Sequence, residues 1–252
     1  MANGEEKKTA LEHKVGQDGR FRHPDQNVIP ESWGSVARGA PPVVGAASPD
    51  ISDLLVLRPG RVIGLEGPTG FGLTRVGFSM LAEPSQHAPV VVVDARGWMC
   101  PIAAWETGVR ADRLAVVRCD DRTVWPGVIA ALLEGVKAMY AEVPSGVPES
   151  MLRRLGALAR SSDASVVFRP LHGRLPSGVA YLRVRAERVV WAGAHNGHGR
   201  LTGRRMTLEL SGKGAAGRSQ WVELEDDGSH IQKNNVRVVS RLAASEARRA
   251  VG

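Results

Sequence analysis

Residues 61–74 read RVIGLEGPTGFGLT, and this stretch decides how the rest of the chain is interpreted. An apolar run ends at Gly67, four residues separate that glycine from Gly72, and Leu73 and Thr74 follow. This is the spacing of the phosphate-binding loop G-x-x-x-x-G-K-[ST], with leucine in place of its lysine. Glycines suit such a loop because its backbone N–H groups must turn inward around phosphate oxygens, and the N-terminus of the following helix adds partial positive charge.

Two interpretations of this stretch remain open. We expect Gly67, Gly70, Gly72 and Thr74 to form a vestigial nucleotide-binding loop that does not support ATP hydrolysis, because leucine cannot neutralise phosphate charge. The simpler alternative is a glycine-rich turn between a strand and a helix. In both cases the pattern predicts a strand before the loop and a helix after it.

The composition is that of an ordinary globular protein. The chain has 252 residues, of which 43% are apolar, so it can hold one domain of good size plus tails. No apolar run reaches the length of a membrane span, and the first twenty residues are charged rather than apolar, which favours a cytoplasmic protein without a secretory signal. Cys100 and Cys119 lie far apart without the spacing of metal ligands, so we expect two buried, reduced thiols.

The chain divides into three parts. Residues 1–50 mix charges with Gly, Pro, Asn and Ser and are predicted to form a largely disordered extension. Residues 51–225 are predicted to form the folded core. Residues 226–252 begin acidic and finish as a basic helix or tail around 242–249.

Strand and helix patterns alternate through the first part of the core. Apolar runs predict strands at 62–65, 90–93, 114–118, 138–143 and 165–168, and helical spacing predicts helices at 73–82, 101–109, 125–136 and 149–160. This alternation is typical of an α/β protein with a mainly parallel, doubly wound sheet. Beyond a turn at 176–178, alternating residues predict strands near 181–184, 189–191, 206–210 and 221–224, as an antiparallel C-terminal edge.

The positive charge is concentrated in one region. Most of the net charge of +7 falls within 181–221, which indicates an anionic partner. Candidate DNA-binding residues there are Arg183, Arg185, Arg200, Arg204 and Arg205. Period-two alternation would put Arg183 and Arg185 on one face of a strand, where a solvated sheet face is the alternative to a binding surface. His195, Asn196 and His198 are more typical of a solvated turn than of a metal site, and we expect no bound metal.

Several segments together resemble the RecA ATPase core. These are GPTGFGLT, VVVVDARGWMCPIAAWETGV after the second strand, LRVRAERVVWAG and MTLELSGKGAAG, within a similarity that covers residues 54–225. Among RecA relatives, a short version with a degenerate nucleotide site and an N-terminal extension looks most like the ImuA family of mutasome accessory proteins, in its actinobacterial ImuA-prime form. The resemblance implies a RecA-like P-loop core.

The departures from the RecA pattern imply that catalysis has been lost. Leu73 replaces the lysine, Arg96 falls where the catalytic glutamate directly follows Asp-Ala, and Glu142 takes the place of the Walker B aspartate. An arginine cannot accept a proton from the attacking water. The loops after Glu142 and Phe168 are brief, so DNA binding of the filament type is not expected.

The resemblance therefore implies a non-catalytic scaffold in the DNA damage (SOS) response and error-prone translesion synthesis. Its expected partner is ImuB and, through ImuB, an error-prone C-family DNA polymerase, with association with the nucleoid on DNA damage. Two other interpretations are an ATP-dependent RecA paralogue acting on DNA and a regulator that holds a nucleotide without hydrolysing it. Candidate partner-binding residues are Leu54, Leu55, Leu57, Ile102 and Trp105, with Trp105 the foremost.

Overall fold

The computed structural model describes residues 55–193, 201–226 and 236–239. Several predictions lie outside these described residues. They are the disordered extension at 1–50, the partner-binding Leu54, the loop histidines and Arg200, and the helix or tail at 242–249.

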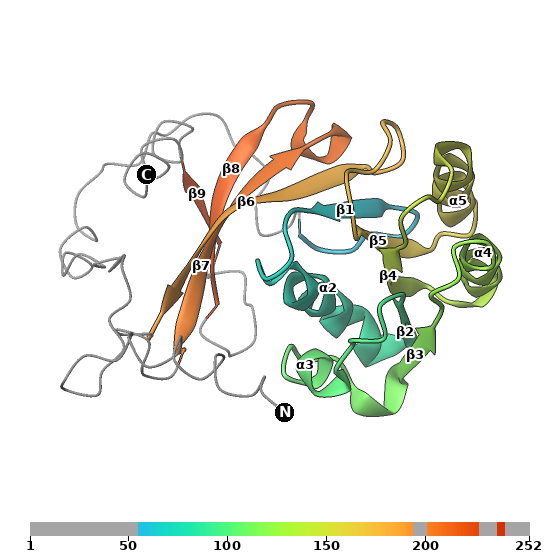
Figure 1. Ribbon diagram of the computed structural model, residues 1–252, viewed down its shortest axis with the longest axis horizontal. Coiled ribbons are helices and arrows are strands. Elements are labelled where there is room, and N and C mark those ends of the chain that lie inside the picture. Colours follow the sequence, from blue (N-terminus) through green and yellow to red (C-terminus); the bar gives the residue numbers. More distant parts are fainter. Residues whose placement is uncertain (1–54, 194–200, 227–235, 240–252) are drawn as a thin grey trace, which may run out of the picture. The chain divides into compact units, whose positions relative to one another are not determined.

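Within these described residues, nine strands form a single sheet in the order β3-β2-β4-β5-β1-β6-β7-β8-β9 (Figure 1). Its parallel part comprises β1 (Val62–Glu66), β2 (Val90–Asp94), β3 (Leu114–Arg118), β4 (Ala138–Val143) and β5 (Ser165–Pro170). β1 lies in the interior of the sheet, paired in parallel with β5 on one side and with β6 on the other. The predicted α/β class and parallel sheet are confirmed.

The antiparallel part comprises β6 (Leu182–Ala192), β7 (Gly203–Ser211), β8 (Gln220–Asp226) and β9 (Val236–Val239). These strands add to the parallel sheet through β6, so the predicted antiparallel edge is confirmed. The strand or bent pair expected across 181–191 is one strand, β6, whose register with β7 shifts between Ala186 and Arg188. A bulge of this kind bends a strand without ending it.

The helices lie on both faces of the parallel strands (Figure 1). They are α2 (Leu73–His87), α3 (Pro101–Trp105), α4 (Trp125–Gly135) and α5 (Glu149–Ser161), with short 3-10 turns at Ala111–Arg113 and Lys213–Ala215. α2 and α3 pack against each other, as do α4 and α5. Among the described helices none is both long and apolar enough to cross a membrane.

The valines of β2 show why this sequence forms a two-sided sheet. Val90 and Val92 join the core that contains α2, whereas Val91 and Val93 join the core that contains α4 and α5. Side chains alternate along a strand, so a continuous apolar run fits a strand that is covered on both faces. All four valines are buried.

Three local predictions were wrong. The first helix does not end near Pro84 but continues to His87 with the proline inside it. The helix beginning at Pro101 ends at Trp105 rather than 109, because a turn follows in which Gly108 has a φ of 94°. Cys100 is exposed instead of buried, since it lies at the N-cap of α3, while Cys119 is buried as expected.

Candidate functional site

The glycine-rich loop connects the carboxyl end of β1 to α2, as the motif predicted. Gly72 is the N-cap residue of α2 and has a φ of 75°, a conformation that side chains rarely adopt. Gly67 has a φ of 145°, and a Cβ there would lie 3.0 Å from the Cβ of Ala186 in β6. Glycine is therefore required at position 72 by the backbone conformation, and at position 67 by the backbone conformation and by close packing against β6.

The residues that follow the loop play different parts. Leu73, at the position of the missing lysine, is 2% exposed and belongs to the apolar core beneath α2. Thr74 is half-buried, and the buried hydroxyl of Tyr140 lies beside it without hydrogen-bonding geometry. Position 73 thus contributes packing rather than charge.

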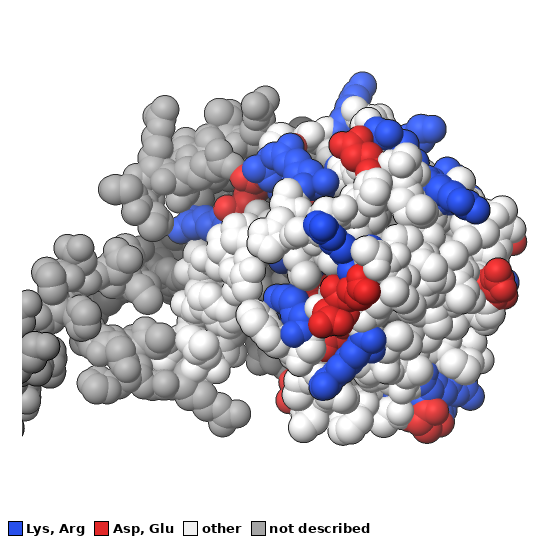
Figure 2. All heavy atoms as spheres, turned by 45° about the vertical axis from the view of Figure 1, so that its right-hand side comes forward, with Lys and Arg blue, Asp and Glu red and all other residues white. Residues whose placement is uncertain are grey.

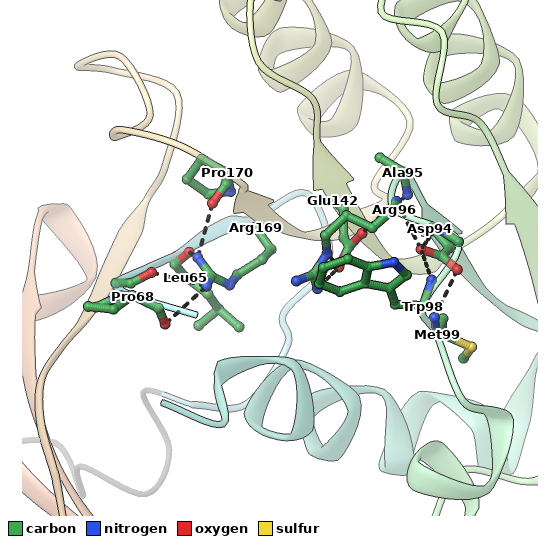
Figure 3. Close-up of polar contacts among 12 residues, drawn as sticks. Leu65, Pro68, Asp94, Ala95, Arg96, Trp98, Met99, Glu142, Arg169 and Pro170 are labelled. Carbon is green, nitrogen blue, oxygen red and sulfur yellow. Dashed lines mark hydrogen bonds and ion pairs between the residues drawn. The ribbon is translucent and has the colours of Figure 1, made fainter. Parts of the chain in front are cut away.

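Arg96 and Glu142 form an ion pair at the carboxyl ends of β2 and β4 (Figure 3). Both Nε and Nη2 of Arg96 donate to Oε1 of Glu142, with 3.0 Å for Nε. The main-chain N–H groups of Ala95 and Arg96 donate to the other oxygen, Oε2, at 3.2 and 3.3 Å. Both carboxylate oxygens therefore already accept hydrogen bonds from the protein.

The charges of this pair stabilise each other. The hydrogen bond to Glu142 raises the pKa of the Arg96 guanidinium, so Arg96 stays charged. The guanidinium also lies 5.1 Å from the ring centroid of Trp98, within the range of a cation–π contact. The guanidinium of Arg96 neutralises the buried carboxylate of Glu142.

Asp94, at the end of β2, organises the loop that carries Arg96 and Trp98. Its Oδ1 accepts hydrogen bonds from the main-chain N–H groups of Arg96, Gly97 and Trp98, and its Oδ2 accepts one from Met99 (Figure 3). This carboxylate is buried, and the bonds fix the direction of the chain from β2 toward α3. The motif DARG thus encodes a rigid turn.

Arg169, which the sequence patterns do not indicate, is hydrogen-bonded to the backbone of the glycine-rich loop. It lies at the end of β5, is 5% exposed, and donates to the carbonyl oxygens of Gly67 and Pro170 at 3.0 Å (Figure 3). Its Nε has no hydrogen-bond partner among the described residues. Burial lowers the pKa of this guanidinium. No pattern in the sequence around Arg169 indicates its contact with the glycine-rich loop.

The four described arginines of the predicted DNA-binding set all pair with acidic side chains. Arg183 pairs with the buried Glu66, Arg185 with Glu187, Arg204 with Asp226 and Arg205 with Glu225. Arg183 and Arg185 do share a face, as alternation predicted, because Leu182, Val184 and Ala186 point into the core between them.

Exposure divides these four arginines. The side chain of Arg204 is 7% exposed and that of Arg183 is 20% exposed, whereas Arg185 and Arg205 are about 40% exposed. Figure 2 shows Lys and Arg side chains interspersed with Asp and Glu over one face, with no single basic field there. DNA binding stays a prediction for the whole set, of which Arg185 and Arg205 have the most exposed side chains among the four described.

The predicted partner-binding residues also divide by burial. Leu57 is 9% exposed within the apolar core and Leu55 packs partly against that core, so both contribute to packing within the chain. Ile102 and Trp105, in contrast, are 55% and 45% exposed. Trp98, which the sequence did not place in the set, is 72% exposed on the loop before α3. We call Trp98, Ile102 and Trp105 the α3 surface.

An open cavity of about 580 Å³ lies against residues 66–69 and Phe71 of the glycine-rich loop. Its lining comes from the end of β1, the loop itself, residues 170–174 and the middle of β6. Arg185 and Glu187, which pair with each other, both reach it. Among the described residues no group of three His, Cys, Asp or Glu side chains is arranged to hold a metal ion.

Comparison with known proteins places part of this chain beside one family. Residues 52–173 match the family described as the MT3502 N-terminal domain. The matched segment contains β1 to β5 and α2 to α5, and therefore the glycine-rich loop, the Arg96–Glu142 pair and the α3 surface. No curated protein matches the chain.

Proposed function

We propose that this chain is a non-catalytic, RecA-like accessory protein that binds a protein partner in an error-prone translesion synthesis mutasome. The observation that carries the non-catalytic part is the ion pair between Arg96 and Glu142. In an ATPase of the type that the motifs resemble, these two positions activate water and hold a metal. In this chain the side chains of Arg96 and Glu142 form an ion pair with each other instead.

Two further features support a RecA-like core that has lost its chemistry. The glycine-rich loop follows β1, an interior strand of the sheet, and leads into a helix, which is the context that the phosphate-loop motif requires. Leu73 is buried in the core at the point where the motif calls for a lysine. The loop is therefore kept as a structural element.

The α3 surface supports a role in partner binding. Trp98, Ile102 and Trp105 are large apolar side chains with roughly half or more of their surface exposed, within eight residues of sequence. Exposed aromatic residues are frequent anchors of protein interfaces, and truncating a central one costs roughly 2 kcal/mol or more. The partner that the sequence resemblance suggests is ImuB, which would bring an error-prone C-family polymerase and locate the complex at damaged DNA.

Co-purification of the chain with ImuB tests this proposal. We expect the wild-type pair to purify together, and Trp105→Ala and Ile102→Ala to weaken the complex at least tenfold. Val124→Ala is the matched control, because Val124 is 54% exposed at the N-cap of α4, outside the α3 surface. Circular dichroism must show that each variant is folded.

Two results would contradict the proposal. One is a complex that survives both substitutions on the α3 surface but is lost with Val124→Ala. The other is ATP hydrolysis stimulated by single-stranded DNA in the wild-type protein, which would favour a RecA paralogue acting directly on DNA.

A further inference from the structure

The guanidinium of Arg204 lies in the space that a side chain at Gly72 would fill. A Cβ built on Gly72 would be 1.5 Å from Nη1 of Arg204 and 2.2 Å from its Cζ. Arg204 belongs to β7, in the antiparallel part of the sheet, whereas Gly72 is the N-cap of α2. Nη2 of Arg204 also donates to the carbonyl oxygen of Gly72 at 3.4 Å.

Three contacts hold Arg204 in this place. Its Nε and Nη2 donate to Oδ2 of Asp226, at the end of β8, at 3.0 and 2.6 Å. Its guanidinium lies 5.5 Å from the ring centroid of Trp191. Asp226 is 4% exposed and also accepts a hydrogen bond from Nε of Arg75, in the first turn of α2, at 3.1 Å. The β7–β8 strands are thereby tied to the start of α2.

The buried ion pair of Arg204 and Asp226 therefore lies at the N-terminus of α2. The N-terminus of an α-helix attracts anions because its first N–H groups lack intrahelical partners. α2 has no acidic residue in its first turn and no side-chain cap, and Asp226 contacts that turn through the side chain of Arg75. A polyphosphate that approached the loop at Gly72 would have to displace the guanidinium of Arg204 and so break its buried ion pair with Asp226. Breaking a buried ion pair costs free energy because a buried charge is left without its partner.

We propose that Arg204, held by Asp226, is an autoinhibitory contact that closes the glycine-rich loop to phosphate-bearing ligands. Glycine is then required at position 72 because any side chain there would overlap the guanidinium of Arg204. The loop serves to join α2 to the antiparallel strands. The inference does not depend on the partner proposed above.

A double-mutant cycle tests whether position 72 must be glycine to make room for Arg204. We expect Gly72→Ala to lower the Tm by roughly 4 °C more than Gly70→Ala in the wild-type background, since the added methyl group displaces the guanidinium. Gly70 is the matched control, because its φ of 85° imposes similar backbone strain while no atom lies within 4 Å of a Cβ at that position. In the Arg204→Ala background the two glycine substitutions should lower the Tm equally. Equal losses already in the wild-type background would overturn the proposal.

Binding of sodium tripolyphosphate tests the closure. The variant Arg204→Ala/Asp226→Asn removes one charge of each sign and leaves the net charge unchanged. We expect millimolar tripolyphosphate to leave the Tm of the wild-type protein unaltered and to raise that of the double variant, because a ligand that binds only the folded state stabilises it. If the double variant does not fold, Arg204→Met, which retains the side-chain stem, takes its place.

Two outcomes would overturn the closure. Binding by the wild-type protein that is lost in the variant would make Arg204 a ligand of the anion instead of a barrier to it. Absence of binding in both proteins would mean that the contact closes no anion site.

Discussion

The ring of Tyr140 occupies the space left by the absent side chain of Gly77. A Cβ on Gly77 would lie 2.4 Å from Cδ2 of the tyrosine, so α2 approaches β4 as closely as it does only because a glycine faces the ring. Phe78, the next residue of α2, packs edge-on against the same ring with 5.3 Å between centroids. This contact sets the distance between α2 and the sheet.

Gly77→Ala should therefore destabilise the protein although alanine is the better helix former. Overpacking of this kind costs about 1–3 kcal/mol, and urea unfolding measures it. Gly127→Ala in α4 is the control, since no atom lies within 4 Å of a Cβ at that exposed position. The control should be neutral or stabilise by up to about 1 kcal/mol. Equal effects of the two substitutions would contradict the close approach.

Tyr140→Phe should flatten the loss of stability in alkali. Burial raises the pKa of the Tyr140 hydroxyl above its usual value of 10.0, so above about pH 10 the unfolded chain releases this proton while the folded chain retains it. Folding stability is then unaffected below that pH and falls as pH rises, by up to about 1.4 kcal/mol per pH unit. Urea unfolding of both proteins between pH 8 and pH 11, with roughly unit steps, measures the difference. Parallel curves would contradict the burial of the hydroxyl.

Arg96→Ala should destabilise the chain by roughly 2–3 kcal/mol in urea unfolding, because it leaves the buried carboxylate of Glu142 without its cation. Glu142→Gln should cost less, since an amide oxygen still accepts the N–H groups of Ala95 and Arg96 and Arg96 itself is partly exposed. Arg110→Ala breaks an exposed pair with Asp112 and should leave the midpoint unchanged. A midpoint unchanged by Arg96→Ala would show that the pair contributes nothing to stability.

Leu73→Lys should lower stability without creating ATP hydrolysis. The substitution places an ammonium group in the apolar core, and Arg96, which is paired with Glu142, cannot accept a proton from water. Phosphate release with and without single-stranded DNA, at a temperature where the variant is folded, measures the activity. Turnover above that of buffer would mean that Leu73 alone had silenced the site.

The elements that local patterns specify could be predicted from the sequence. The valine run of β2 and the helical spacing around Ile129 gave both the type and the approximate bounds of their elements, because each segment is covered by the core on the face that its pattern indicates. The continuation of α2 past Pro84 could not be predicted, since a proline usually ends a helix or kinks it.

The polar contacts of the site were harder to predict than the elements. Asp226 joins Arg75 across 151 residues of sequence and Arg204 across 22, so the network depends on which strands are neighbours. The order of strands follows from packing of the whole sheet, which no local pattern encodes. Arg169 likewise acquires its role only because β5 lies beside β1.

The interior position of β1 has a consequence for how the chain is made. Glu66 at its end pairs with Arg183 of β6, 117 residues further along the chain. The first of the described strands to leave the ribosome therefore receives its second neighbour only after β2 to β5 have been made. Contacts between such distant residues slow folding. Until β6 is synthesised, one edge of β1 stays unpaired, and nascent or prematurely terminated chains expose an apolar strand edge on which aggregation begins.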